Sequence, residues 1–451
     1  MSHPGLSETA VDEELQRVGR ELFAAFPSGS RHPMRALDAR AMELASSDRE
    51  LRAALFRFVD VVPACRSLDD LARHLSAFLD EVPETPAPLA TAMKISGTRA
   101  GRAALGAAAA GGVRHLAHRF IVGETPTAAL GVFRGLWDHG VASSVDLLGE
   151  ATVTQPEADR YASRCADAIE SLAGPMAAWP TRETLEADGA GILPRCNVCV
   201  KISALTPLLR PDAPALGQRD AANRLRPLLR QAQRSGAHLH IDMESLDSRE
   251  AVLELVLALL DEEEFASGPS TGIVLQAYLR DSPEMLAQVI AWAQATRRRP
   301  PLTVRLVKGA YWDHELVQAR QHGWPVPVFE DRADCDRNFE TLTSGLLAAR
   351  PSVRVAVASH NLRSVAHAIA VNRVSGGADG DLELQVLRGL GDELQHALAA
   401  RGFRVRTYCP VGDLVAGMAY LVRRLLENTS NESFLSEQAR GTPVDQLLAA
   451  P

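Results

Sequence analysis

The sequence predicts an α/β fold, a (β/α)8 TIM barrel preceded by an all-helical N-terminal segment. Three observations support this. Residues 10 to about 112 show helical periodicity and no strong strand pattern. Beyond them, short apolar segments alternate with amphipathic helices, a pattern typical of a parallel sheet with helical crossovers. Polar and ionisable residues collect where those apolar segments end.

The composition narrows the possible partners. Of 451 residues, 46% are hydrophobic and 23% are charged, which is ordinary for a globular protein. The net charge of -8 argues against a general nucleic-acid surface, so we expect no nucleic-acid partner. An acidic protein that binds an acidic ligand needs a local basic site.

The six cysteines are too few for a disulfide scaffold in a chain of this length. Cys196-Asn-Val-Cys199 has a suggestive spacing, but a zinc ribbon needs a second pair, and we interpret both as small apolar residues of a buried strand. The N-terminus has no basic segment followed by an apolar run, and no window reaches about 18 uninterrupted apolar residues. We therefore expect a cytoplasmic protein without a membrane span.

The N-terminal segment places apolar residues at helical spacing, for example over 51–59 and 68–79. Residues 83–88 form a break, and the Ala/Gly-rich segment 106–112 is interpreted as a joint. These features place a helical arm at 1–112, the barrel at 113–435 and a C-terminal tail at 436–451.

The second part of the chain contains nine strand patterns, at 119–124, 144–150, 197–205, 238–244, 272–279, 303–310, 353–361, 382–389 and 404–410. A barrel of this class has eight strands, so one pattern lies outside it. The sequence does not say which.

The ends of these patterns carry Glu150, Lys201, Asp242, Glu244, Gln276, Tyr278, Lys308, Tyr311, His360 and Asn361. In a (β/α)8 barrel the carboxyl ends of all strands open on one face, which holds the active site. An open doubly wound sheet, with its site at a switch point, is the alternative.

The segment 303–312 places Arg305 and Lys308 in an otherwise buried strand. Both cations need anionic partners, because a lone buried charge is unfavourable. The partners are either internal carboxylates or a cofactor that bears phosphate or is rich in electrons. Tyr311 and Trp312 would wall a flat ligand, or else belong to the core.

His238, His240, Asp242 and Glu244 share one strand face by the period of two. Together with His360, this favours a second hypothesis, a metal-dependent barrel hydrolase. Neither a GxGxxG nor a GxxxxGK[ST] motif occurs, so a redox cofactor would be held in another way.

Tyr420, Arg423, Arg424 and Glu427 fall on one stripe of a predicted helix. Two adjacent guanidinium groups suit a carboxylate or phosphate that lies between them. A solvated helix with an Arg423–Glu427 surface pair explains the same spacing.

Six motifs together resemble proline dehydrogenase, in particular the dehydrogenase part of the bifunctional bacterial proline utilisation proteins. The resemblance covers residues 30–435, and its motifs are VKISAL (200–205), HIDMES (240–245), VLQAYLRDS (274–282), VRLVKGAYWD (304–313), ASHN (358–361) and YCPVGD with AYLVRRLLEN (408–428). It implies a distorted barrel whose last helix lies across the mouth, so that Arg423 and Arg424 point inward.

The resemblance also implies the roles of the site residues. The arginine pair would bind the carboxylate of proline, and the ring would be surrounded by Lys201, Asp242, Tyr311, Tyr408, Leu306 and Tyr420. Lys201 and Asp242 are interpreted as an orienting ion pair. Non-covalent FAD would be contacted by Gln276, Arg305, Val307, Lys308, His360 and Glu427, with Glu244 and Trp312 close by.

The implied reaction is hydride transfer from proline C5 to flavin N5, which yields Δ1-pyrroline-5-carboxylate in the first step of proline catabolism to glutamate. Electrons would pass to a membrane quinone, which implies peripheral contact with the inner face of the cell membrane. We expect neither the aldehyde dehydrogenase domain nor the DNA-binding ribbon–helix–helix of longer relatives in this chain. A further hypothesis treats residues 1–110 as a docking module on an inactive barrel.

Overall fold

The computed structural model describes residues 7–26, 49–83, 87–95, 97–149, 151–413, 417 and 441–451. The predicted helix that carries Tyr420, Arg423, Arg424 and Glu427 lies outside these residues. The chain divides into two compact units. One comprises Met1–Phe26, Pro126–Cys409 and Pro443–Pro451, and the other comprises Pro27–Thr125 and Pro410–Thr442.

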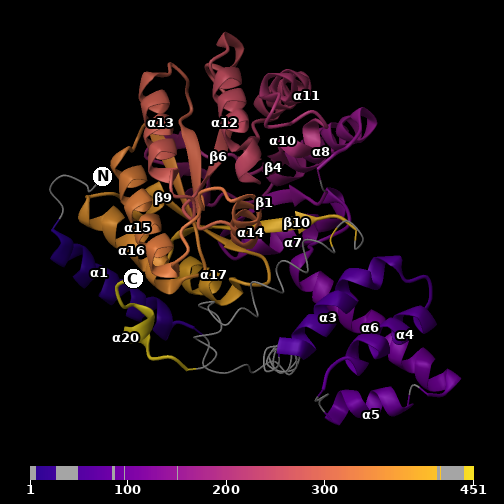
Figure 1. Ribbon diagram of the computed structural model, residues 1–451. Coiled ribbons are helices and arrows are strands. Elements are labelled where there is room, and N and C mark those ends of the chain that lie inside the picture. The colour runs from indigo at the N-terminus through magenta and orange to yellow at the C-terminus, as the bar shows by residue number, and fades with distance from the viewer. Residues whose placement is uncertain are drawn as a thin grey trace. The chain divides into compact units, whose positions relative to one another are not determined.

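The first unit is built on a closed barrel of eight strands in the order β1-β10-β9-β8-β7-β6-β5-β4 (Figure 1). The strands are β1 (Val141–Leu147), β4 (Asn197–Lys201), β5 (His238–Asp242), β6 (Ser270–Gln276), β7 (Leu302–Val307), β8 (Val353–Ala358), β9 (Leu382–Leu387) and β10 (Arg404–Val411). Strand β1 pairs with β4 in parallel, and each later strand from β5 to β10 pairs in parallel with the barrel strand before it. The predicted (β/α)8 class is confirmed, and closure of the sheet rules out the open doubly wound alternative.

The pattern at 119–124 is the one that lies outside the barrel, and its interpretation as a strand was wrong. Helix α6 (Arg99–Phe120) runs into it, and the backbone N–H of Ile121 closes the last turn on the carbonyl of Ala117. Phe120 and Ile121 are apolar because both are buried at a helix end. A short apolar run has the same sequence pattern in either setting.

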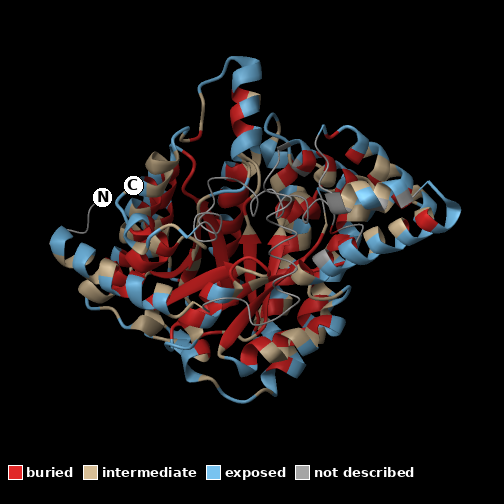
Figure 2. Cartoon of the chain, turned by 90° about the horizontal axis from the view of Figure 1, so that it is seen from below, coloured by how far each residue is buried: buried red, intermediate tan, exposed pale blue. Residues whose placement is uncertain are grey.

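Helices follow the strands and cover the outside of the barrel. Along the chain they are α7 (Pro126–Asp138), α8 (Gln155–Ala177), α9 (Glu183–Glu186), α10 (Ile202–Leu205), α11 (Pro214–Ser235), α12 (Leu246–Leu260), α13 (Ser282–Ala295), α14 (Trp312–His322), α15 (Arg332–Ala348), α16 (Leu362–Val374) and α17 (Asp392–Ala399). Figure 2 shows the consequence, with buried strands at the centre and helices whose outer faces are exposed. Thr154 and Glu157 start α8 with a reciprocal capping box.

Two further elements complete this unit. Helix α1 (Glu8–Ala24) packs on α16 through buried Leu15, Val18 and Leu22, and α20 (Val444–Leu447) packs beside it. A short antiparallel hairpin, β2 (Ala187–Asp188) with β3 (Gly191–Ile192), precedes β4.

The second unit is helical, as predicted, with α3 (Arg49–Val61), α4 (Leu68–Asp80), α5 (Ala87–Ile95) and α6. Residues 106–112 do not form the expected joint, because α6 continues through them. At Gly106 a Cβ would lie 2.0 Å from the carbonyl oxygen of Leu68, so the glycine allows α4 and α6 to pack closely. Across the described ranges, no helix is both long and apolar enough to cross a membrane.

Candidate active site

The carboxyl ends of the barrel strands bring a set of charged side chains together. Arg305 Nη1 lies 2.7 Å from Asp242 Oδ1, and the Tyr408 hydroxyl donates to Asp242 Oδ2 at 2.7 Å. Lys201 binds Asp146, and its Nζ is 3.9 Å from Asp242 Oδ2. We refer to these five residues, from β1, β4, β5, β7 and β10, as the upper cluster.

The neighbouring charges determine the protonation states in the upper cluster. Burial acts to lower the pKa of Lys201, but the carboxylates of Asp146 and Asp242 outweigh it and hold that pKa well above its ordinary value. Burial, together with the same two carboxylates, raises the pKa of Tyr408 well above its ordinary value. Lys201 is therefore a cation and Tyr408 a hydrogen-bond donor at neutral pH, and neither is a general base.

The upper cluster is balanced in charge, because Lys201 and Arg305 offset Asp146 and Asp242. The predicted Lys201–Asp242 pair is present at 3.9 Å, but Asp146 is the closer partner. Sequence reasoning missed Asp146, although a carboxylate inside the buried segment VASSVDL was an available signal. The expectation that Arg305 has an anionic partner is confirmed by Asp242.

Beneath the upper cluster, Arg305 is held from a second side. Its Nε donates to Gln385 Oε1 at 2.7 Å, and the Gln385 amide donates to Glu383 Oε1 at 2.6 Å. Glu383 in turn receives two hydrogen bonds from Arg406, at 2.8 and 3.1 Å. The orientation of Arg305 thus depends on a buried chain of polar groups that sequence reasoning did not find.

The residues predicted to contact a cofactor lie at neighbouring strand ends. Gln276 donates to the carbonyl of Glu244 at 3.0 Å, and its Oε1 is a buried acceptor without a partner among the described atoms. Burial raises the pKa of Glu244, whose carboxyl group accepts a hydrogen bond from Ser203. His360 accepts from the backbone N–H of Leu387 at 2.9 Å through Nε2.

The end of β7 leads to the remaining predicted residues. Lys308 has the anionic partner that its position required, Asp336 on α15. Tyr311 packs on an apolar cluster that includes Tyr278, and the Trp312 indole donates to the carbonyl of Phe329 at 2.7 Å. Leu306 and Val307 are neighbours of Arg305 on β7, and Leu306 is fully buried.

Strand β5, which carries His238, His240 and Asp242, does not form the metal site of the hydrolase hypothesis. His238 Nε2 and His240 Nδ1 are hydrogen-bonded to each other at 3.1 Å, and Asp242 is bound by Arg305 and Tyr408. No group of three His, Cys, Asp or Glu side chains within the described ranges is arranged to hold a metal ion. The hydrolase hypothesis is therefore not favoured.

Comparison with known proteins agrees with this geometry. Residues 129–437 match the model of the family described as proline dehydrogenase, and residues 12–120 match that of the proline utilization A N-terminal domain. The bifunctional protein PutA of Salmonella typhimurium is 32% identical over 349 residues, 75% of this chain and 25% of that protein. Proline dehydrogenase of Deinococcus radiodurans is 29% identical over 321 residues, 71% of this chain and 89% of that protein.

Among solved structures, proline utilization A from Bdellovibrio bacteriovorus, inactivated by N-propargylglycine, is similar with a TM-score of 0.89 and 34% identity. The match covers 98% of this chain and 44% of that one, so this chain spans less than half of that relative. The family match covers most of the chain and the whole barrel from β1 to β10. The chain belongs to the proline dehydrogenase family.

Proposed function

We propose that this chain oxidises L-proline to Δ1-pyrroline-5-carboxylate with a non-covalently bound FAD. The observation that supports it is the upper cluster, in which Asp242 is held between Arg305 and Tyr408 at the carboxyl end of a barrel of this family. FAD, when bound, would supply the two-electron oxidant that takes the hydride lost from proline C5, while the proton lost from the amine nitrogen would pass to solvent.

The residues present fit a flavin. Gln276 Oε1 is a buried acceptor without a partner among the described atoms, and an N–H on a flavin edge would satisfy it. Arg305 is a fixed cation that would stabilise negative charge on a reduced ring. We assign FAD binding to these two residues and to Val307, Lys308, Trp312, His360, Glu244 and Glu427.

The substrate carboxylate needs a further cation, because the charges of the upper cluster already offset one another. We assign it to Arg423 and Arg424, with Tyr420 and Leu306 beside the ring. Lys201, Asp242, Tyr311 and Tyr408 would then orient the substrate. Since the raised pKa of Lys201 keeps it protonated, Lys201 positions proline and does not remove its amine proton.

The proposal extends to the cellular role. Oxidation of proline in this way is the first step of its catabolism to glutamate, and a membrane quinone is the proposed electron acceptor. We propose a cytoplasmic location with peripheral contact at the membrane. Relatives named bifunctional are longer than this chain.

A visible absorption spectrum tests the proposal. Purified protein supplied with FAD should be yellow, and anaerobic L-proline should bleach the flavin absorbance, while glycine should leave it unchanged. N-propargylglycine, which inactivated the Bdellovibrio relative, should abolish the bleaching. Flavin-loaded protein whose absorbance is unaffected by L-proline would contradict the proposed function.

A further inference from the structure

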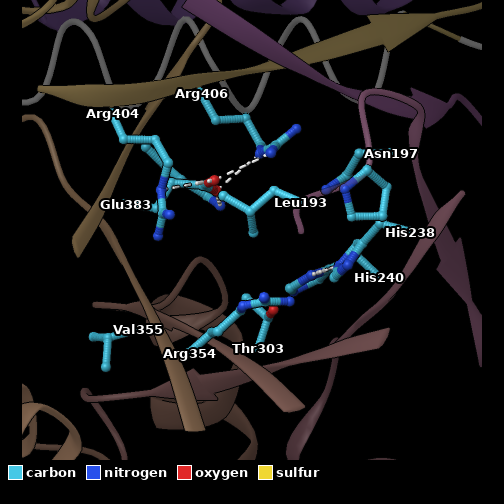
Figure 3. Close-up of a pocket in the computed structure, with 12 residues that line it drawn as sticks. Leu193, Asn197, His238, His240, Thr303, Arg354, Val355, Glu383, Arg404 and Arg406 are labelled. Carbon is cyan, nitrogen blue, oxygen red and sulfur yellow. Dashed lines mark hydrogen bonds and ion pairs between the residues drawn. The ribbon is translucent and has the colours of Figure 1, made fainter. Parts of the chain in front are cut away.

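A second polar site lies at the opposite, amino-terminal end of the barrel. This lower pocket is lined chiefly by His240, Thr303, Arg354, Glu383, Arg404 and Arg406. Thr303, Arg354, Glu383 and Arg404 are each the first or second residue of their strands. In Figure 3, Arg404, Arg406 and Glu383 lie on one side of the pocket, and Arg354 and Thr303 lie on the other.

The charged groups of the lower pocket do not balance. Glu383 is bound by Arg406 at 2.8 Å and lies 3.7 Å from Arg404 Nε. Asp188, on the β2–β3 hairpin, accepts from Arg354 at 3.0 Å and from Arg404 at 3.2 Å. Three guanidinium groups thus share two carboxylates, which leaves one positive charge in excess.

This excess charge is almost completely shielded from solvent. Arg354, Arg404 and Arg406 have exposed fractions of 3%, 1% and 3%. The histidines of the pocket do not add charge, because burial lowers the pKa of His240 and of its neighbour His238 well below the ordinary value. A buried charge that lacks a counter-charge is unfavourable, because the protein interior solvates an ion less well than water does.

Three buried nitrogen atoms of the lower pocket have no hydrogen-bond partner within the described structure, Arg354 Nη1, Arg404 Nε and His240 Nε2. Arg354 binds Asp188 through Nε and Nη2, and Nη2 also donates to the carbonyl of Ile192 at 3.1 Å. Its Nη1 is buried and makes no hydrogen bond. Buried guanidinium N–H groups are rarely left without an acceptor, so this atom indicates a ligand that accepts hydrogen bonds.

We propose that the lower pocket binds one small monovalent inorganic anion of the size of chloride. A single negative charge neutralises the excess, and a one-atom anion suits a small pocket lined by Arg354, Thr303 and Arg404. A divalent phosphate would reverse the imbalance. The pocket lies below the upper cluster, to which Gln385 connects it through a hydrogen bond to Arg305, but the charge argument uses no residue of the upper cluster and does not depend on the proposed oxidation of proline.

A pair of matched variants tests the charge argument. Thr303→Asp places a negative charge of the chain itself in the lower pocket. Thr303→Asn introduces a side chain of nearly the same size as Asp but without the charge. At constant ionic strength, replacing gluconate with chloride should raise the Tm of the parent protein saturably, by about 2 °C. Thr303→Asn should keep this rise and Thr303→Asp should lose it.

An equal Tm of the parent in both salts, or an equal rise in both variants, would overturn the proposal. Diffraction from crystals of the parent protein grown in sodium bromide gives a second readout, needed if Thr303→Asp does not fold. An anomalous bromide peak within hydrogen-bond distance of Arg354 Nη1 is expected. Ordered water at that position without anomalous signal would show that the pocket holds water and not an anion.

Discussion

The hydroxyl of Tyr408 donates a 2.7 Å hydrogen bond to Asp242 across the interior of the barrel, between two strands, β10 and β5, that are not neighbours in the sheet. Arg305 from β7 binds the other oxygen of the same carboxylate, and its guanidinium lies 5.3 Å from the centre of the Tyr408 ring. One carboxylate on β5 therefore holds side chains from two other strands, β7 and β10.

Replacing Tyr408 with phenylalanine should weaken this arrangement. Loss of a buried hydrogen bond to a charged acceptor should lower the free energy of unfolding by about 2 kcal/mol. We also expect kcat/KM for proline oxidation to fall by about tenfold, equivalent to about 1.4 kcal/mol. Denaturant unfolding and steady-state kinetics measure the two effects.

Tyr278→Phe is the matched control, because the Tyr278 hydroxyl is buried and makes no hydrogen bond in the described structure. Its removal should leave the free energy of unfolding unchanged or raise it, because the buried hydroxyl has no hydrogen bond to lose. Equal losses in the two variants would mean that the Tyr408–Asp242 bond contributes nothing specific.

Gln385→Leu should destabilise the barrel from within. The change leaves Arg305 Nε without an acceptor and removes a donor from Glu383, both in a buried setting. The expected loss in free energy of unfolding is about 3 kcal/mol. Gln321→Leu, at an exposed position on α14, is the control and should stay within about 0.5 kcal/mol of the parent.

The stability of the protein should decrease below about pH 6.5 because of its buried histidines. Burial and the nearby arginines lower the pKa of His238 and His240 in the folded chain, so the unfolded chain binds protons that the folded chain excludes. The stability they contribute is present above the unfolded pKa of about 6.5 and is lost as the pH falls below it.

Each excluded proton contributes a slope of about 1.4 kcal/mol per pH unit. His240→Gln should therefore reduce the slope of unfolding free energy between pH 6.5 and about 5 by that amount. His314→Gln, at an exposed position, is the control. A His240→Gln slope equal to that of the parent would contradict this account.

Arg423→Met tests the proposed carboxylate clamp. Loss of a charge-assisted contact of about 2–4 kcal/mol should raise the KM for proline by about 30-fold or more. FAD affinity should change little. An unchanged KM would remove Arg423 from the substrate site.

Lys308→Ala should weaken FAD binding and leave proline binding nearly unchanged, because the Lys308–Asp336 pair lies at the end of β7 on the proposed flavin side. We expect the Kd for FAD to rise about tenfold, while the KM for proline in saturating FAD stays within about twofold. Fluorescence titration of the apoprotein with FAD measures the first quantity. If Lys308→Ala and Arg423→Met change the same parameter, the two sites are not separate.

Sequence alone determined the architecture of the barrel. The alternation of buried apolar segments with amphipathic helices predicted eight of the strands, because these periodicities are local properties of the chain. It also determined that Arg305 and Lys308 require counter-charges, since both are cations in a buried segment. The strand predicted at 119–124 was wrong because a short apolar-rich segment has the same sequence pattern at the end of a helix as in a strand.

The tertiary structure decided which groups meet. Asp242, Asp146 and Asp336 are the partners of Arg305, Lys201 and Lys308, and none of these pairs is close in sequence. Strand register and closure of the barrel set these distances, and both depend on packing of the whole sheet and not on any local pattern. Closure of the barrel also brings Gln385 within hydrogen-bond distance of Arg305. In the lower pocket it places Arg354, Arg404 and Arg406 around the carboxylates of Asp188 and Glu383.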